Sequence, residues 1–261
     1  MLGAGRMGKE IIRKALEEGI EVVAVIDKDN SEFIGKDAGQ LSGAWNIGVE
    51  VEGSSKLSNI LDKKKIDVVV DFTNAEACVE NSRIICDKRI NMVIGTTGFT
   101  ESQMNDLKGY IEKSGVGAVI SPNMSVGVNV FWSLVRDATK KLSDYDIEII
   151  ELHHRFKKDS PSGTAIRTAE IIARELNRDL NKVAVCGRKG FKKRTIEEIG
   201  IHAIRAGDIV GEHTVLYSTI GERIEIKHTA HSRMAFVNGV IKAVEFIKGK
   251  KGIYGMNDVI G

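Results

Sequence analysis

The chain has 261 residues, 42% of them hydrophobic and 28% charged, and its 38 basic and 36 acidic side chains leave a net charge of +2. This balance excludes the strongly basic surface of a nucleic-acid-binding protein, and no apolar run approaches the roughly 18 residues that a membrane span requires. The length suits two compact units, each with its own core. We therefore expect an ordinary globular protein with neither a nucleic-acid nor a membrane partner.

The cysteines point to no special chemistry. Cys78, Cys86 and Cys186 are an odd number without a CxxC spacing, which argues against both a disulfide framework and a zinc site. No secretory signal opens the chain. We expect a cytoplasmic protein without a metal.

Short β-branched runs alternate with helical patterns in the first half of the chain. The expected strands cover residues 20–27, 66–73, 91–97 and 116–122, and the expected helices cover residues 6–18, 55–64, 75–88 and 100–113. The last of these helices begins with a capping box, in which Thr100 and Gln103 satisfy each other's backbone donors. Because such alternation produces βαβ units, it predicts a parallel, Rossmann-type sheet.

The pattern changes after Asn123. A long helix at 125–142, a strand at 144–154 and a helix at 161–177 lead to three extended segments, at 200–208, 211–219 and 222–230. Because no helix separates these segments, they predict an antiparallel or mixed sheet. A final helical pattern at 232–250 is expected to return to the first domain. The sequence thus predicts an α/β protein, with a Rossmann-type parallel-sheet domain over residues 1–124 and 234–261 and a smaller α+β domain with a mixed sheet over residues 125–233.

A glycine motif opens the chain. Gly3, Gly5 and Gly8 have the G-x-G-x-x-G spacing immediately before a helix, and Asp27 ends the next strand. Glycines at this spacing permit a tight turn, the helix start attracts a pyrophosphate, and the acid accepts hydrogen bonds from ribose hydroxyls. Together these features predict a dinucleotide site, for which the alternative is a plain tight turn.

The strand that should precede this motif is short. Strands usually have roughly five residues, whereas only Met1 and Leu2 stand before Gly3. A sheet without its central strand would expose two unpaired ladders. We therefore expect the true start of the protein to lie upstream of Met1, with a short apolar strand that ends at Leu2.

A second glycine-containing segment, "IGTTGFT", covers residues 94–100. It follows an expected strand at the carboxyl edge of the sheet, where ligands bind in open α/β folds. Gly95 and Gly98 flank two threonines, so backbone groups and hydroxyls are available to an amide or a ribose. The alternative is an ordinary loop between a strand and a helix.

The stretch "ELHHRFKKDSPSGTA", residues 151–165, is unusually rich in polar chemistry. On an extended strand His153 and His154 point to opposite faces, so they do not readily chelate one metal. Either histidine alone is as easily a structural residue, and Lys157 and Lys158 alone are as easily a solvated pair. Together with the helix start that follows, they indicate a site.

That helix start suits an anion. Ser160 is a possible cap and Pro161 fits the first helical position, which leaves the N–H groups of residues 162–164 beside a lysine. A carboxylate ligand matches this arrangement.

Seven segments now resemble one family. "GAGRMGKE", "DFT", "GTTGF", "SPNMSVGVN", "ELHHRFKKDSPSGTA", "RAGDIVGEHTV" and "SRMAFVNG" follow in the order seen in the dihydrodipicolinate reductase family, the 4-hydroxy-tetrahydrodipicolinate reductases of the bacterial lysine and diaminopimelate pathway. The resemblance spans essentially the whole chain. It implies a nicotinamide-dependent reduction of a cyclic dicarboxylate imine. It also implies that the first domain binds NADH or NADPH and that the second binds substrate and forms a homotetramer through its sheet.

The resemblance also implies roles for single residues. His153 matches the acid/base histidine and Lys157 the proton donor. The expected substrate-binding residues are His154, Ser162, Gly163, Thr164 and Arg233. The expected cofactor-binding residues are Gly3, Gly5, Arg6, Met7, Gly8, Asp27, Lys28, Phe72, Gly95, Thr96, Thr97, Gly98, Ser121, Pro122, Asn123 and Met124.

Two features depart from the family pattern, and two other functions compete. Asn74 stands where many members have an arginine, and Lys28 after Asp27 leaves the preference between NADH and NADPH open. One rival function is a dehydrogenase of the aspartate dehydrogenase type, which acts on an open-chain amino acid. The other is a catalytically silent dinucleotide sensor, which would have no need of His153 and Lys157.

Overall fold

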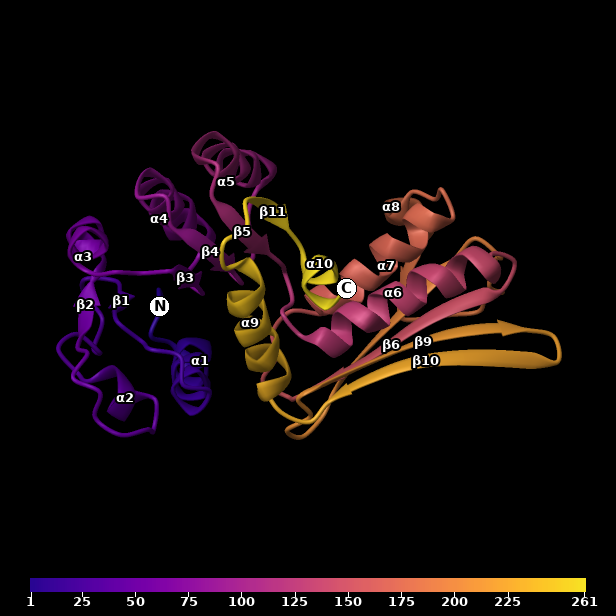
Figure 1. Ribbon diagram of the computed structural model, residues 1–261. Helices are drawn as coiled ribbons and strands as arrows, with labels where there is room; N and C mark the ends of the chain where they lie inside the picture. The colour runs from indigo at the N-terminus through magenta and orange to yellow at the C-terminus, as the bar shows by residue number, and fades with distance from the viewer. The chain divides into compact units, whose positions relative to one another are not determined.

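The computed structural model describes all 261 residues (Figure 1) and divides them into two compact units. Unit 1 comprises Met1–Val126 and Phe236–Gly261, and unit 2 comprises Gly127–Ala235. The boundaries expected from the sequence lie two residues earlier at each junction. Each unit has its own hydrophobic core. No helix is long and apolar enough to cross a membrane.

Unit 1 is built on parallel strands. A four-stranded sheet has the order β11-β5-β4-β3, and β1 and β2 form a second pair. The strands are β1 (Val25–Asp27), β2 (Val51–Gly53), β3 (Val68–Asp71), β4 (Asn91–Ile94), β5 (Gly117–Ile120) and β11 (Gly252–Tyr254). All of their pairings are parallel, which confirms the predicted Rossmann-type sheet.

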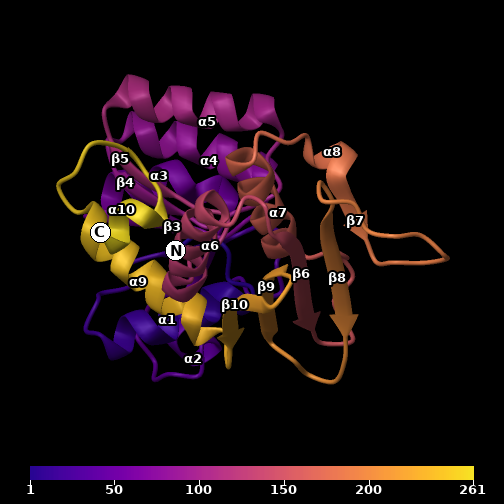
Figure 2. The ribbon, with the colours of Figure 1, turned by 90° about the vertical axis from the view of Figure 1, so that its right-hand side faces the viewer.

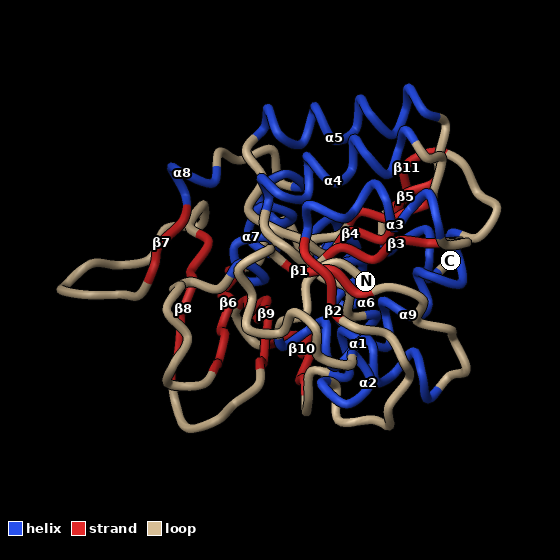
Figure 3. Tube along the Cα trace, turned by 90° about the vertical axis from the view of Figure 1, so that its left-hand side faces the viewer, coloured by secondary structure: helices blue, strands red, loops and turns tan.

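Helices cover both faces of these strands, as Figures 1 and 3 show: α3, α4 and α5 lie on one side, and α1 and α9 on the other. The helices of unit 1 are α1 (Arg6–Glu17), α2 (Ala38–Leu41), α3 (Leu57–Lys63), α4 (Ala75–Asp87), α5 (Glu101–Ser114), most of α9 (Met234–Ile247) and α10 (Met256–Ile260). Burial on both faces explains why the strands read as continuous apolar runs. The predicted capping box of Thr100 and Gln103 is present at the start of α5.

The segment Met1–Gly3 connects the two groups of strands, and Leu2 is its bridging residue. It forms parallel bridges to Ile26 of β1 and to Asp71 of β3. Its amide donates to the Val70 carbonyl at 2.8 Å, and the Gly3 amide donates to the Ile26 carbonyl at 2.8 Å. Leu2 therefore holds the position of a central strand, in which it is the only paired residue.

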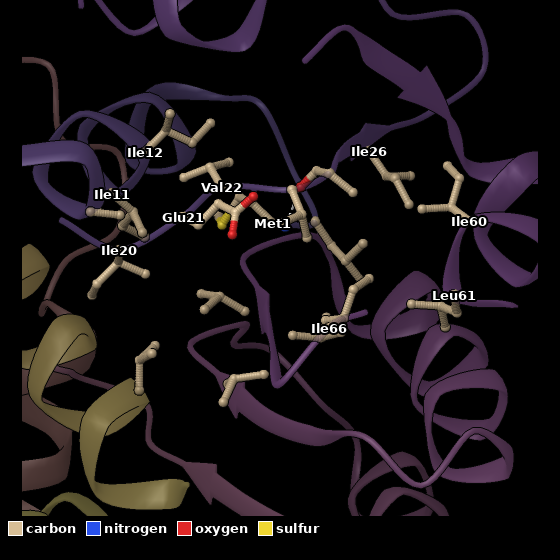
Figure 4. Close-up of a pocket in the computed structure, with 18 of the residues that line it drawn as sticks. Met1, Ile11, Ile12, Ile20, Glu21, Val22, Ile26, Ile60, Leu61 and Ile66 are labelled. Carbon is tan, nitrogen blue, oxygen red and sulfur yellow. Dashed lines mark hydrogen bonds between the residues drawn. The ribbon is translucent and has the colours of Figure 1, made fainter. Parts of the chain in front are cut away.

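A groove lies beside Leu2, where further residues of a central strand would run. A cavity of about 90 Å³ opens there between mainly apolar side chains (Figure 4). Its lining includes Met1, Ile12, Ile20, Val22, Ile66 and Val244. The strand predicted over residues 20–27 is regular only from Val25, although the Ala24 carbonyl just before it accepts a hydrogen bond from the Met1 amino group at 2.8 Å.

Unit 2 contains a five-stranded mixed sheet with the order β10-β9-β6-β8-β7 (Figure 2). Strand β6 pairs parallel with β8 and antiparallel with β9, which confirms the predicted mixed sheet. The strands are β6 (Asp146–His153), β7 (Ala184–Cys186), β8 (Ile199–Arg205), β9 (Gly211–Thr219) and β10 (Glu222–Ala230). Its helices are α6 (Val126–Lys141), α7 (Gly163–Glu175) and α8 (Leu180–Val183). The core of the unit lies between α6, α7 and the sheet.

Helix α7 begins later than the sequence suggested. The cap is Ser162, whose hydroxyl accepts a hydrogen bond from the Ala165 amide at 3.2 Å, and the first helical residue is Gly163. The predicted cap at Ser160 and first helical position at Pro161 are wrong. The buried Glu151 carboxylate explains the difference, because it accepts from the Ser162 amide at 2.9 Å and thereby fixes that residue just outside the helix.

Candidate active site

The glycine loop leaves no room for side chains at two of its positions. Gly3 has a φ of +89°, and a Cβ there would stand 2.6 Å from the Phe72 carbonyl oxygen. A Cβ on Gly8 would stand 1.9 Å from the Gly3 carbonyl oxygen. Gly5 is the N-cap residue of α1, and no side chain makes a capping hydrogen bond there. Arg6 and Met7 are the first two residues of the helix. The first amides of α1 thus have no side-chain acceptor, which suits a phosphate.

Asp27 is tied to this loop. Its carboxylate accepts from the Lys28 amide at 2.8 Å, from the Ala4 amide at 3.2 Å and from the Ser31 hydroxyl at 3.3 Å. The contact with Ala4 joins the end of β1 to the glycine motif. The structure therefore brings together the glycines and the acid that the sequence separated by about 20 residues.

Two further loops meet through Asp71, a residue that the sequence analysis did not select. Its buried carboxylate accepts from the Thr73 amide at 3.0 Å and from the Thr96 hydroxyl at 2.8 Å. Asp71 thus joins the end of β3 to the "GTTG" loop after β4. Thr96 is buried in this contact, whereas Thr97 and Gly98 are exposed.

The segment that follows β5 is shaped by its own hydrogen bonds. The Ser121 hydroxyl donates to the Asn123 carbonyl at 2.8 Å, and the Ser125 amide donates to the Asn123 side chain at 2.9 Å. Met124 is buried and Pro122 is exposed. The expected cofactor residues of unit 1 therefore lie in the glycine loop and just beyond the carboxyl ends of β1, β3, β4 and β5. This is the edge where open α/β sheets bind ligands, and its residues fit a dinucleotide.

In unit 2, alternation along β6 places Glu151 and His153 on the same buried face. The Nδ1 atom of His153 lies 2.5 Å from a carboxylate oxygen of the fully buried Glu151. Arg205 donates two further hydrogen bonds to this carboxylate, at 2.8 and 2.9 Å. A carboxylate, a guanidinium and an imidazole thus form one buried network.

Burial and hydrogen bonding set the charges in this network. Burial opposes ionisation of Glu151, but the hydrogen bonds from Arg205, His153 and the Ser162 amide outweigh it and hold the pKa of Glu151 below its usual range. Burial also lowers the pKa of His153, and the nearby Glu151 only partly offsets this. At neutral pH we therefore assign an ionised Glu151 and an uncharged His153.

The turn after β6 carries the basic residues. His154 is half-buried, and its ring lies 6.2 Å from that of Phe156. The Lys157 ammonium forms an ion pair with Asp159 at 2.8 Å, and Lys158 is exposed. Arg233 is exposed beyond the end of β10, and no hydrogen bond or ion pair joins it to His153 or Lys157.

The helix start differs from the expected anion site of free amides. The Ser162 amide is already bonded to Glu151. Burial opposes ionisation of Asp159, but Lys157 and, to a smaller extent, the Gly163 amide hold the pKa of Asp159 below its usual range. Gly163 is exposed and Thr164 half-buried. The helix start therefore interacts with two of the protein's own carboxylates, and its binding of a ligand carboxylate stays a prediction.

His213 completes the network and was also missed by the sequence analysis. It is buried on β9, with Nε2 3.2 Å from the Ser162 hydroxyl and its ring 5.2 Å from that of His153. Burial lowers the pKa of His213 to about 3, so the ring is uncharged. A sequence signal existed, since Glu151 and His213 both stand in segments that resemble the family.

Comparison with known proteins covers both units. The family model described as "Dihydrodipicolinate reductase, N-terminus" matches residues 1–124, and that described as "Dihydrodipicolinate reductase, C-terminus" matches residues 127–260. The 4-hydroxy-tetrahydrodipicolinate reductase of Methanothermobacter thermautotrophicus is 50% identical, across 98% of this chain and 96% of the relative. That of Methanocaldococcus jannaschii is 51% identical, across 98% of this chain and 94% of the relative.

Solved structures agree. A dipicolinate-bound dihydrodipicolinate reductase from Paenisporosarcina sp. TG-14 has a TM-score of 0.76 and 26% identity, over 98% of this chain and 97% of that one. An amine dehydrogenase from Mycobacterium smegmatis shares the fold, with a TM-score of 0.61 and 13% identity over 98% of this chain and 93% of that one. The two family models and the half-identical relatives together extend over nearly every residue, so the chain belongs to the dihydrodipicolinate reductase family.

Proposed function

We propose that this chain is an oxidoreductase that reduces 4-hydroxy-tetrahydrodipicolinate to tetrahydrodipicolinate with NADH or NADPH, in lysine and diaminopimelate biosynthesis. The observation that carries this proposal is the full-length identity of about half with relatives that bear this name. The glycine loop with Asp27 in unit 1, and the network around His153 in unit 2, supply the two sets of groups that such a reaction requires.

The substrate is a ring with two carboxylates, as is the dipicolinate bound to the reductase from Paenisporosarcina sp. TG-14. Cationic groups and helix N-termini bind such anions. We assign one carboxylate to Lys157 and to the start of α7 at Gly163 and Thr164. We also propose His154, Ser162 and Arg233 as substrate contacts. The Ser162 amide in addition donates a hydrogen bond to Glu151 within the protein.

The nicotinamide supplies a hydride when it is bound. The work of this chain's own residues is to hold both reactants and to manage protons. Lys157 carries an ammonium proton for the reduced substrate, and His153 presents an imidazole for acid/base exchange. Burial around His153 strengthens its electrostatic interactions, because little water screens them.

Cofactor choice follows from the charges near the ribose. Asp27 is suited to ribose hydroxyls and should repel a 2′-phosphate. Lys28 and Arg6 are both exposed near the same loop and offset this repulsion. We propose that both NADH and NADPH are used.

We propose further that the protein is a cytoplasmic homotetramer, assembled through the sheet of unit 2. The side chains of Ile204 on β8 and Ile224 on β10 are exposed on that sheet although they are apolar, and subunit contact would remove them from water.

The test is oxidation of NADH and of NADPH with freshly generated cyclic substrate. Turnover with that substrate supports the proposal. Turnover with aspartate or another open-chain amino acid instead would favour the amino-acid dehydrogenase, and cofactor binding without any turnover would favour the sensor.

A further inference from the structure

Strand β6 carries two glutamates that each pair with a histidine, Glu148 with His202 of β8 and Glu151 with His153, and the pairs differ in burial. Glu148 bonds to His202 at 2.7 Å and to Arg188 at 2.6 Å, as Glu151 does to His153 and Arg205. The two glutamates are three residues apart, so they point to opposite faces of the sheet. Glu148 retains 19% exposure of its side chain, whereas Glu151 has none. Only the Glu151 pair lies in the candidate active site.

We propose that Glu151, itself held by Arg205, is a positioning residue that fixes the tautomer and the direction of the His153 ring so that Nε2 is presented to the substrate. This inference rests on the proposed reductase function and adds Glu151 and Arg205 to its machinery. Neither residue is among those that the sequence analysis selected.

The tautomer follows from the donor and acceptor inventory. An ionised carboxylate only accepts hydrogen bonds, so the 2.5 Å contact with Glu151 requires the proton on Nδ1 of His153. In the uncharged ring the Nε2 lone pair is then free to take a proton, or to give one back once the ring is charged. An Nε2–H tautomer would place two lone pairs, on Nδ1 and on the carboxylate, against each other.

The direction of the ring follows from the strand register. Arg205 on β8 is the register partner of His153, so its guanidinium reaches the carboxylate two residues back along β6. On the other side, a Cβ on Gly211 of β9 would lie 3.1 Å from His153 Nε2. Because residue 211 is a glycine, no side chain at that position crowds the Nε2 edge.

Glu151→Gln tests the proposal, with Glu148→Gln as its matched control on the opposite face. The amide keeps the shape but offers an N–H to Nδ1 and loses the charge. We expect kcat to fall by roughly tenfold to 10⁴-fold, the range for residues that orient a histidine, with little change in KM. The pH at which His153 titrates in the kcat/KM profile should move lower, because the neighbouring negative charge is gone. Glu148→Gln should keep the kcat and the pH profile of the unaltered chain.

A long-range ¹H–¹⁵N NMR spectrum of the unaltered protein reads the tautomer without any activity, and so remains decisive even if Glu151→Gln does not fold. We expect the Nδ1–H form at His153, assigned by its loss in His153→Gln. An Nε2–H form, or a folded Glu151→Gln protein with unchanged kcat and pH profile, would overturn the proposal. An Nδ1–H form in a protein that does not reduce the cyclic substrate would overturn the proposed function and leave the positioning geometry standing.

Discussion

The ring of Phe72 fills the space that a side chain on Gly95 would need. A Cβ at residue 95 would lie 2.1 Å from the nearest ring atom. Gly95→Ala must therefore displace the ring of Phe72, which we place at the cofactor edge. The dissociation constants for NADH and NADPH should then rise at least roughly tenfold, which corresponds to a loss of about 1.4 kcal/mol of binding free energy. Calorimetric titration measures this. Gly109→Ala is the control, because a Cβ there has nothing within 4 Å and should leave cofactor affinity unchanged. If Gly95→Ala bound the cofactors as tightly as Gly109→Ala does, the placement of Phe72 at the cofactor site would be contradicted.

His153→Gln and Lys157→Met should each lower kcat by roughly a hundredfold or more, the usual scale of general acid catalysis. Cofactor affinity should stay unchanged, since the proposed cofactor residues belong to unit 1. Thr164→Val should chiefly raise KM, because it removes binding that is equal in ground and transition states. Steady-state kinetics on variants with a confirmed fold decide this. Near-normal turnover in both His153→Gln and Lys157→Met would contradict a role in proton transfer and leave the two residues as solvated basic side chains.

Asp27→Ala should weaken NADH binding more than NADPH binding, because only the ribose hydroxyls of NADH gain from the carboxylate. In the unaltered chain we expect the two cofactors to differ by less than about a hundredfold, roughly 2.7 kcal/mol. Titration with each cofactor tests both statements. A greater loss for NADPH than for NADH would contradict the role given to Asp27.

Acidification should destabilise the protein through His213. Its pKa is lowered from 6.5 to about 3 by burial and then by His153, with Lys157 and His228 acting in the same direction and Glu151 against them. Below pH 6.5 the unfolded chain therefore binds a proton that the folded chain does not, so this stability is complete at higher pH and is lost as the pH falls towards 3. Between pH 7.5 and 5.5 the free energy of unfolding should drop by roughly 1.4 kcal/mol from this residue.

Urea unfolding at the two pH values measures this loss, and His213→Asn is the comparison. The variant removes the titrating group, so its stability should depend less on pH by about the same amount. An identical pH dependence in both proteins would show that the pKa of His213 is the same in the folded and unfolded states, and would contradict the lowered pKa.

The groove beside Leu2 should accept a strand. An added extension of five β-branched apolar residues before Met1 can pair with residues 22–24 on one side and with Val68 on the other. The melting temperature should rise by several degrees, because about 1 kcal/mol already shifts it by about 2–4 °C in a domain of this size. Differential scanning calorimetry provides the measurement. An extension of equal length with alternating prolines, which cannot donate to the ladder, should give no such rise.

Local sequence patterns were sufficient for most elements. Helices α1, α4 and α5 and the capping box at Thr100 follow from periodicity and cap chemistry, which act over a few residues. The short elements β2 and α2 were not predicted, because three or four residues carry too little pattern. The length of β1 depends on which segments lie beside it in space, and the start of α7 depends on a contact with Glu151 from another strand.

In the candidate site, too, local motifs could be predicted from the sequence and contacts between distant segments could not. Glycines and the polar stretch after β6 are visible as motifs, but the partners of His153 are not. Arg205 follows it by 52 positions and meets it only through the register of β6 with β8. His213 comes opposite Glu151 only through the register of β6 with β9. Residues brought together by pairing have no fixed spacing in the sequence, so only the resemblance of their segments to the family marks them.

The ion pair of Lys157 with Asp159 bears on how a ligand would enter. If a substrate carboxylate binds at Lys157 and the start of α7, it replaces an anion that is already there. Binding is then an exchange of one carboxylate for another, and Asp159, which retains 58% exposure of its side chain, turns to water while the ligand is bound. The Lys157 ammonium thus has a negative partner both before the ligand arrives and while it is bound.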